Sequence, residues 1–466
     1  MAGISFETHN PATGEVLRRY TYLEVFEIES HIARSEVAFR NWKAQSLSDR
    51  VLKLRPLPAV WRQRKREIAE MITTEMGKPL KESLYEVDRC QSLIEYYIQR
   101  SEDLLSPQNI PDAIGYRSYV HPAPMGPLLG IMPFNFPAYQ SLRFAFPAIL
   151  AGNSVMIKPA DNVLNSQVLV DAILREGGLD EDVLQSITVS RKDIGSVIAD
   201  PRVRGVTITG GTDAGRAVAA QAGRALKKVV LELGGNDPYI VLADANLDVA
   251  AECCVRARFQ NSGQSCLAAK RWIVDRQVLP EFRKRVLSKM ESLKVGDPSQ
   301  VTTSIGPIGR ADLLKKLQDQ VARAKQGGAT VTYSSQDTLE GKMTTGYFHP
   351  LLLLENVKPK NTAFEEEIFG PVAVLIEAAD QNEAVRLANS SPYGLGAALF
   401  SQDIERAEQI ARDELDVGIV FINDFVKSSP MVPFGGTKDS GYGRELGHHG
   451  LWEFTNPKSI QIKCLI

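Results

Sequence analysis

The chain has 466 residues, of which 44 % are hydrophobic and 24 % are charged, a composition typical of a soluble globular enzyme. Its 54 basic and 56 acidic residues leave a net charge of −2, so the charge balance gives no reason to expect nucleic acid or an anionic membrane as a partner. The length exceeds that of one compact core, so we expect about two or three domains.

The cysteines indicate a reducing compartment. They number five, an odd and irregularly spaced set, at Cys90, Cys253, Cys254, Cys266 and Cys464. Residues 1–7 lack the basic-then-apolar pattern of a signal peptide, and no apolar stretch reaches the roughly 20 residues that cross a bilayer. We therefore predict a cytoplasmic protein with no membrane partner.

The first quarter of the chain is predicted to be helical. From about Tyr22 to Leu105 the apolar residues recur with a helical period and glycines are few. Pro56 and Pro58 interrupt this pattern, and a helix there should kink or end. Residues Tyr116 to Leu129 change to short β-like runs, which we expect to form a hairpin arm.

Two successive α/β regions follow. Between about Pro133 and Val241, strand-like runs (Ser154–Ile157, Gly205–Thr209, Lys228–Leu231) alternate with helical segments, which predicts a parallel sheet of the dinucleotide-binding kind. A second alternation extends from about Asn236 to Phe434. Its predicted helices and strands are Ala251–Asn261, Leu279–Leu293, Ala311–Gln326 and Asn382–Asn389, and Ala269–Val274, Val372–Ile376 and Gly418–Ile422. The last residues alternate like a strand.

Cys266 and Glu232 have the residue types needed for covalent catalysis. A thiolate is a strong nucleophile at neutral pH, and a nearby carboxylate can activate a thiol or a water molecule. The pair could form a thioester and then hydrolyse it. Taken alone, Cys266 is equally consistent with a small, buried, inert residue. Glu232 lies in an apolar segment, where a buried ion pair is the alternative.

A glycine turn is the candidate phosphate site. Gly210 and Gly211 follow a predicted strand and precede a predicted helix, so backbone N–H groups could approach a pyrophosphate closely. The full Gly-x-Gly-x-x-Gly pattern is absent. A turn that only connects the strand to the helix is the alternative.

Six blocks in register resemble the aldehyde dehydrogenase superfamily of nicotinamide-dependent oxidoreductases. The resemblance extends from NPATG at residues 10–14 almost to the C-terminus. The blocks are PFNFP at 133–137, IKPA at 157–160, LELGGN at 231–236, QNSGQSC at 260–266, EEIFGPV at 366–372 and PFGG at 433–436. The resemblance implies an α/β fold with a Rossmann-type NAD-binding domain, a catalytic domain and a small β oligomerisation arm.

The resemblance also implies the domain ranges and the assembly. It places the NAD-binding domain at residues 1–105 and 125–235, the catalytic domain at 236–440 and the arm at 106–124 and 446–466. In the family the C-terminal segment joins the arm in an oligomerisation sheet. A homodimer or homotetramer is therefore expected.

The cofactor residues come from the resemblance. Lys158 is expected to bind the hydroxyls of the adenosine ribose, Glu367 to hold the nicotinamide ribose and Phe369 to pack against the nicotinamide ring. Phe134 stands where the family usually has Trp and is placed in the same site. The carboxylate of Asp161 can accept from both ribose hydroxyls and would repel a 2′-phosphate, which predicts NAD over NADP while leaving NADP possible. An exposed loop acid is the alternative for Asp161.

The resemblance assigns the chemical roles as well. The side-chain amide of Asn135 and the backbone N–H of Cys266 would stabilise the developing oxyanion, although Asn135 could also be only a turn residue. Glu232 would deprotonate the water that hydrolyses the Cys266 thioester. Since relatives that transfer the acyl group to coenzyme A commonly lack this base, release of a free acid is expected.

Four residues bear on the substrate. Arg143 lies about two turns into the helix after Pro137, where similar semialdehyde dehydrogenases place an arginine in the substrate tunnel. Its guanidinium would bind a carboxylate, which favours succinic semialdehyde, while a structural ion pair is the alternative. Gln260 replaces a second arginine of the mitochondrial-type enzymes, a pattern that resembles the bacterial type. Ser428 and Ser429 could add hydroxyl donors at the tunnel mouth.

Other functions remain open at this point. Of the six histidines only His448 and His449 are closely spaced, and adjacent residues do not share a helix face, so no metal site is predicted. A non-catalytic structural relative is the alternative from another class. Such a protein could lose Cys266, Glu232 or Asn135 freely, and all three are present in this chain. Within enzymes, the alternative is a broad-specificity aldehyde dehydrogenase for uncharged aliphatic or aromatic aldehydes.

Overall fold

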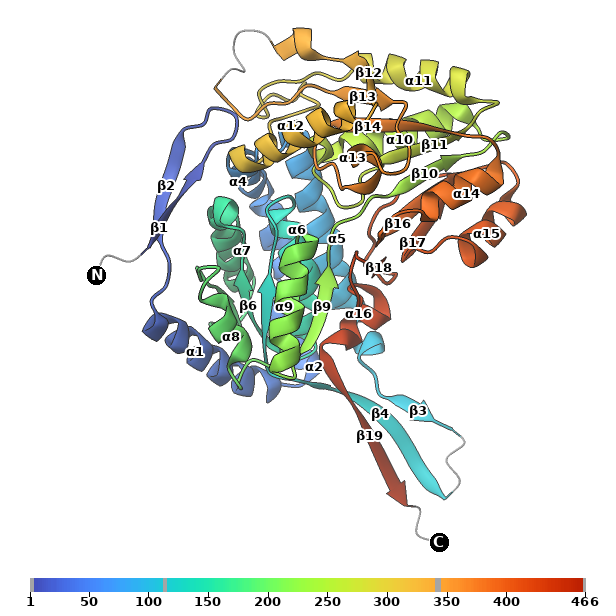
Figure 1. Ribbon diagram of the computed structural model, residues 1–466. Coiled ribbons are helices and arrows are strands. Elements are labelled where there is room, and N and C mark those ends of the chain that lie inside the picture. Colours follow the sequence, from blue (N-terminus) through green and yellow to red (C-terminus); the bar gives the residue numbers. More distant parts are fainter. Residues whose placement is uncertain (1–3, 112–114, 340–344, 464–466) are drawn as a thin grey trace.

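The first of two large sheets has five parallel strands. The computed structural model describes residues 4–111, 115–339 and 345–463 (Figure 1). The strand order is β7-β6-β5-β8-β9. These strands are β5 (Pro127–Ile131), β6 (Ser154–Lys158), β7 (Leu184–Ser186), β8 (Gly205–Thr209) and β9 (Lys228–Glu232). The connecting helices are α6 (Pro137–Leu150), α7 (Leu164–Glu176), α8 (Ile194–Ala199) and α9 (Thr212–Arg224), with a 3-10 turn η1 (Asp161–Val163) before α7.

The register of this sheet brings the predicted residues to one edge. Ile131 lies opposite both Lys158 and Ile208, and Thr209 lies opposite Glu232. The carboxyl ends of β5, β6, β8 and β9 therefore meet, and ligands of open parallel sheets bind at that edge. The strands predicted in this region and the helix that opens at Pro137 are confirmed.

Helices from the N-terminal region cover this half of the molecule. After the antiparallel pair β1 (Ser5–His9) and β2 (Val16–Thr21), the chain forms only helices up to residue 104. They are α1 (Val25–Lys43), α2 (Leu47–Leu54), α3 (Leu57–Gln63), α4 (Lys65–Met76) and α5 (Leu80–Leu104). The predicted break at the prolines is confirmed, because α2 ends at Leu54 and Pro56 caps α3.

The second large sheet has seven strands. Its order is β12-β13-β14-β11-β10-β16-β17, and only β12 is antiparallel to its neighbour. The strands are β10 (Pro238–Val241), β11 (Arg271–Asp275), β12 (Thr330–Ser334), β13 (Leu352–Glu355), β14 (Val372–Ala378), β16 (Gly396–Phe400) and β17 (Ile419–Ile422). Successive residues of β10 point to opposite faces: Tyr239 and Val241 pack in one hydrophobic core and Ile240 in the other. Both faces are therefore buried.

Helices cover this second sheet. They are α10 (Leu247–Phe259), α11 (Leu279–Glu291), α12 (Ala311–Gln326), α13 (Thr362–Glu365), α14 (Gln381–Asn389) and α15 (Ile404–Asp413), with 3-10 turns η2 (Gln260–Gly263) and η3 (Gln336–Leu339). A small pair, β15 (Tyr393–Gly394) and β18 (Thr437–Lys438), lies before α16 (Gly447–Glu453). The predicted helices and strands of this region are confirmed, with ends that shift by a few residues.

A three-stranded sheet extends away from the two larger sheets (Figure 1). It consists of β3 (Gln108–Ile110), β4 (Tyr116–Pro124) and β19 (Thr455–Lys463), and β19 pairs with all nine residues of β4. One expectation was wrong: residues Tyr116 to Leu129 are not a single hairpin. Gly126, at φ +144°, lies between β4 and β5, and β5 enters the buried parallel sheet. Cys464 lies outside the described residues.

Candidate active site

The loop that carries Cys266 is held in an unusual backbone conformation. Asn261 and Ser262, in η2, have φ values of 55° and 53°, a left-handed region that non-glycine residues rarely adopt. The Asn261 side chain donates to the carbonyls of Asn135 and Gln264 at 2.9 and 3.0 Å, and its backbone N–H donates to Glu82. These bonds stabilise the loop and tie Cys266 to the segment that contains Asn135.

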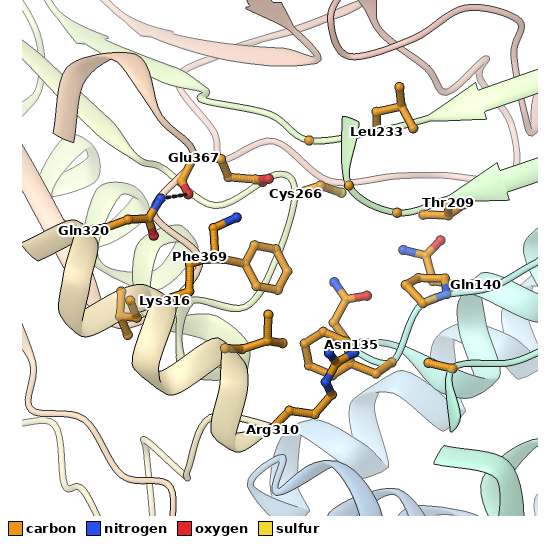
Figure 2. Close-up of a pocket in the computed structure, with 18 residues that line it drawn as sticks. Asn135, Gln140, Thr209, Leu233, Cys266, Arg310, Lys316, Gln320, Glu367 and Phe369 are labelled. Carbon is orange, nitrogen blue, oxygen red and sulfur yellow. Dashed lines mark hydrogen bonds between the residues drawn. The ribbon is translucent and has the colours of Figure 1, made fainter. Parts of the chain in front are cut away.

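Cys266 borders two cavities. The first cavity, of about 280 Å³, contains seven predicted residues on its wall: Phe134, Asn135, Gly210, Gly211, Cys266, Glu367 and Phe369. Figure 2 shows Asn135, Cys266, Glu367 and Phe369 around this space. A second cavity, of about 40 Å³, is also bordered by Cys266. The cysteine therefore lies between two separate cavities.

Asn135 is oriented by the same loop. It is buried, and its Nδ2 donates to the carbonyl of Gln264 at 3.0 Å. An amide nitrogen carries two hydrogens, so a second donor is left for a ligand. The role of Asn135 as an oxyanion donor stays a prediction.

Lys270, which the sequence did not single out, is a cation near the nucleophile. Its Nζ donates to the carbonyls of Ser265 and Cys266 at 2.9 and 2.7 Å and lies 3.1 Å from a carboxylate oxygen of Glu367. Burial raises the pKa of the Cys266 thiol to about 12, while the positive charges of Lys270 and Arg143 lower it. The thiol is therefore protonated at neutral pH until its surroundings change.

Glu232 is buried at the end of β9, where the charges of Glu445 and Arg143 act on it. Both of its carboxylate oxygens are buried without a hydrogen-bond partner. Burial raises the pKa of Glu232 well above its usual range; Glu445 raises it further and Arg143 lowers it. A raised pKa makes the ionised carboxylate a stronger proton acceptor than that of an exposed glutamate. We call Glu232, Arg143 and Glu445 the Glu232 cluster.

Arg143 forms the ion pair that the sequence left open as an alternative. From α6, its Nε donates to Glu445, and both side chains are almost wholly buried. The guanidinium also lies 4.2 Å from the ring centre of Phe434. Its Nη2 is buried without an acceptor, and Arg143 borders the second cavity. The charge of Arg143 is thus already compensated within the protein.

The first cavity fits the phosphate part of a dinucleotide. A Cβ added at Gly211, the residue before α9, would meet no atom within 4 Å, so space lies open in front of the helix N-terminus. The hydroxyl of Thr209, on the same wall, is buried without a hydrogen-bond partner. Free N–H groups at a helix start and an unpartnered hydroxyl suit an anionic ligand.

Lys158 and Asp161 border a third cavity, of about 490 Å³, which shares Ala160 and Arg310 with the first. Nζ of Lys158 lies 2.6 Å from one oxygen of Asp161, and the hydroxyl of Tyr22 donates to the other at 2.7 Å. Arg191, a residue that the sequence did not reveal, borders this cavity as well. The Asp161 carboxylate is therefore already partnered, and an additional cation lies near it.

Glu367 and Phe369 lie on the wall of the first cavity. The Glu367 carboxylate accepts from the backbone N–H of Gly235 at 3.2 Å and pairs with Lys270. The ring of Phe369 packs edge-on against Phe134 at 6.2 Å between centres. The site thus offers a carboxylate for hydroxyl groups and an aromatic surface for a flat ring.

Gln260 and Ser428 border the second cavity with Arg143, whereas Ser429 does not border it. Arg89, from α5, and Tyr139, from α6, border the same cavity and were missed by sequence reasoning. In the described part of the chain no cluster of side chains suits a metal ion, and no helix there is long and apolar enough to span a bilayer.

Comparisons with known proteins agree with the motifs. The profile of the aldehyde dehydrogenase family matches residues 2–460. Succinate-semialdehyde dehydrogenase (NADP(+)) of Deinococcus radiodurans is 40 % identical, over 98 % of this chain and 94 % of that protein. Succinate semialdehyde dehydrogenase (NAD(P)+) Sad of Escherichia coli K12 is also 40 % identical, over 97 % of this chain and 96 % of that protein.

A solved structure shares the fold. The crystal structure of succinic semialdehyde dehydrogenase from Streptococcus pyogenes in complex with NADP+ has a TM-score of 0.94, at 31 % identity, over 98 % of this chain and all of that one. The predicted fold class and resemblance are confirmed. The chain belongs to the aldehyde dehydrogenase family.

Proposed function

We propose that this protein oxidises a semialdehyde, with succinic semialdehyde as the first candidate, to the free dicarboxylic acid with NAD or NADP. The observation that carries the proposal is the position of Cys266 between the first cavity, which suits a dinucleotide, and the second, which cations border. Both relatives described above are named for succinate semialdehyde, and these names support the choice of substrate. A broad-specificity enzyme for uncharged aldehydes is the alternative.

Acylation begins with loss of the Cys266 proton. The Sγ then attacks the aldehyde carbon, and the carbonyl oxygen gains the negative charge. Asn135 Nδ2 and the Cys266 N–H would stabilise that charge; a donor in such a position is worth about 2.7–4 kcal/mol. Lys270 favours the thiolate because its charge lowers the pKa of Cys266.

The dinucleotide would be held by residues of the first and third cavities. Gly210 and Gly211 would face its phosphates, Lys158 and Asp161 its adenosine ribose, and Glu367 its nicotinamide ribose. Phe134 and Phe369 supply the aromatic wall. When bound, nicotinamide supplies the hydride acceptor that this reaction requires.

Glu232 completes the cycle as general base, after the adduct carbon bonded to Cys266 has lost its hydride to the nicotinamide cofactor and the adduct has become a thioester. Glu232 takes a proton from water as the water oxygen bonds to the thioester carbon, and the Cys266 sulfur leaves as thiolate. Its raised pKa makes the carboxylate a stronger base than an exposed glutamate. The role of Arg143 as carboxylate ligand stays a prediction, since Glu445 already pairs with it.

Both forms of the cofactor are compatible with the third cavity. Lys158 balances the charge of Asp161, and Arg191 adds a positive charge nearby. A 2′-phosphate would therefore meet less repulsion than an unpaired Asp161 would impose. We expect use of NAD and NADP, and the preference for NAD stays a prediction.

The assembly and the compartment are also proposals. The three-stranded sheet ends at β19 and β3, whose outer edges have no partner strand within the described residues. Pairing with a second copy would satisfy the β19 edge, which supports a homodimer or homotetramer. Light scattering after size exclusion tests this assembly. The scattered free cysteines support a location in the cytoplasm.

A substrate panel tests the function. Reduction of NAD and NADP is followed with succinic semialdehyde, butanal and benzaldehyde, and we expect the highest kcat/KM with the first. Cys266→Ala should abolish oxidation of all three. Equal kcat/KM values with butanal and succinic semialdehyde would favour the broad-specificity alternative.

A further inference from the structure

We propose that Arg89 is the specificity-determining residue of this site and binds the carboxylate at the far end of the substrate. The inference deepens the proposed function and rests on it. It assigns to a helix α5 residue the role that the motifs suggested for Arg143 in α6.

The charge pairing in the second cavity singles out Arg89. Three cationic side chains border this cavity: Arg89, Arg143 and Lys427. Arg143 is paired with Glu445, and Lys427 lies 2.6 Å from Asp424. Within residues 4–111, 115–339 and 345–463, Arg89 has no ion pair. Its positive charge is therefore available to an anionic ligand.

Arg89 is nevertheless held firmly. Its guanidinium lies over the ring of Tyr139, 4.1 Å from the ring centre. Its Nη2 donates to the Ser428 carbonyl at 3.2 Å and also to the Ser428 hydroxyl. The Tyr139 hydroxyl lies 3.1 Å from the same Ser428 oxygen. We call Arg89, Tyr139 and Ser428 the Arg89 cluster.

This arrangement prepares the Arg89 cluster for a carboxylate. Stacking uses the face of the guanidinium, and the bonds to Ser428 use Nη2, so the in-plane donors on Nε and Nη1 remain for a ligand. The Ser428 oxygen accepts from Arg89 and can accept from the Tyr139 hydroxyl as well, and in that arrangement its own proton can be donated to a ligand. A cation with its rotamer fixed loses little entropy on binding.

The position of the cluster defines the substrate class. Cys266 borders the same narrow cavity, with the Gln260 amide as a neutral donor on its wall. A short chain with an aldehyde at one end and a carboxylate at the other can contact Cys266 and Arg89 together. An uncharged aldehyde of equal length gains nothing from Arg89.

The test is the ratio of kcat/KM for succinic semialdehyde to that for butanal. In R89Q we expect this ratio to fall roughly 10- to 150-fold, the loss of one charge-assisted contact, mostly through KM of the semialdehyde. Butanal kcat/KM should stay within about 3-fold, which also shows that the variant is folded. R100Q, which removes a charge from the exposed part of the same helix, is the matched control and should keep the wild-type ratio.

Each outcome decides between the two proposals. A wild type without preference for succinic semialdehyde contradicts the proposed function, whereas a clear preference that R89Q retains overturns only the role of Arg89. If K427Q loses the preference for succinic semialdehyde and R89Q keeps it, the role of Arg89 is also overturned. Should R89Q lose both activities, R89K decides. An unchanged ratio in that variant overturns the proposal, because a lysine ammonium cannot stack on Tyr139, donate to Ser428 and present fixed in-plane donors to a ligand at the same time.

Discussion

The Glu232 cluster and the Arg89 cluster differ in how their charges are paired. In the Glu232 cluster the charges are buried and compensate one another, with Arg143 paired to Glu445. In the Arg89 cluster the cation is only half-buried and has neutral neighbours. Buried, paired charges set the pKa values of neighbouring groups, whereas an unpaired cation at a cavity is available to a ligand. Residue type alone therefore does not identify a substrate ligand.

Removing the base of the Glu232 cluster should give the largest effect. Glu232→Gln keeps the size of the side chain but cannot accept a proton, so we expect thioester hydrolysis to slow by roughly 10²- to 10⁴-fold. The measurement is rapid mixing with excess substrate: about one NADH per site should form quickly, followed by a slow steady state. An unchanged steady-state rate contradicts the role of Glu232.

Breaking the buried ion pair should destabilise the fold strongly. Glu445→Gln leaves Arg143 without its carboxylate, and we expect a loss of about 3–5 kcal/mol in the free energy of unfolding, read from denaturant curves. The exposed pair of Glu36 and Arg40 provides the control: Glu36→Gln should cost less than about 1 kcal/mol. Similar losses in both variants would remove the distinction between buried and exposed pairs.

The pH dependence of kcat tests how Glu445 influences Glu232. Glu232 works as a base only when ionised, so kcat should fall as pH falls through its raised pKa. The negative charge of Glu445 raises that pKa. Glu445→Gln removes this charge, so we expect the acid limb of the profile to shift to lower pH. A limb that stays in place would show that another group controls the acid limb.

Substitution of Arg143 compares the clusters directly. Arg143→Ala removes the charge that lowers the pKa values of Glu232 and Cys266, so kcat/KM should fall by similar factors, roughly 10-fold, for succinic semialdehyde and butanal. A loss restricted to succinic semialdehyde would instead support Arg143 as a carboxylate ligand, in line with the family motif.

Lys270 should have a moderate effect on the nucleophile. In Lys270→Met the charge that favours the thiolate is lost, and the pH at which iodoacetamide alkylates Cys266 half-maximally should rise by about one unit. Lys289→Met, on the outside of α11 and paired with Glu252, is the control for loss of a charge. An unchanged alkylation profile argues against Lys270.

The smallest expected effect extends the comparison to the third cavity. There Lys158 is paired with Asp161, whereas Arg191 has no ion pair within the described residues. Arg191→Ala should lower kcat/KM for NADP by roughly 5-fold, the value of one exposed charge contact, and leave NAD unchanged. Equal effects on both cofactors would show that Arg191 does not contact a 2′-phosphate.

The sequence by itself determined the parts that depend on local chemistry. Apolar runs bounded by turns located β6, β8 and β9, and α12 begins and ends at the predicted residues. The family blocks identified Cys266 and Asn135, and the turn between a predicted strand and a predicted helix identified Gly210 and Gly211; the fold brings all four to the first cavity. These features are readable because each depends on neighbours a few residues away.

Only the tertiary structure decided which charges are paired. Arg143 meets Glu445 some 300 positions later in the chain, and Arg89 meets Ser428 across a similar separation. Lys270 acts on Cys266 because the chain turns back between them and brings Glu367 to the same point. The free energy of a charge depends on its burial and its partners, and no local pattern in the chain records either.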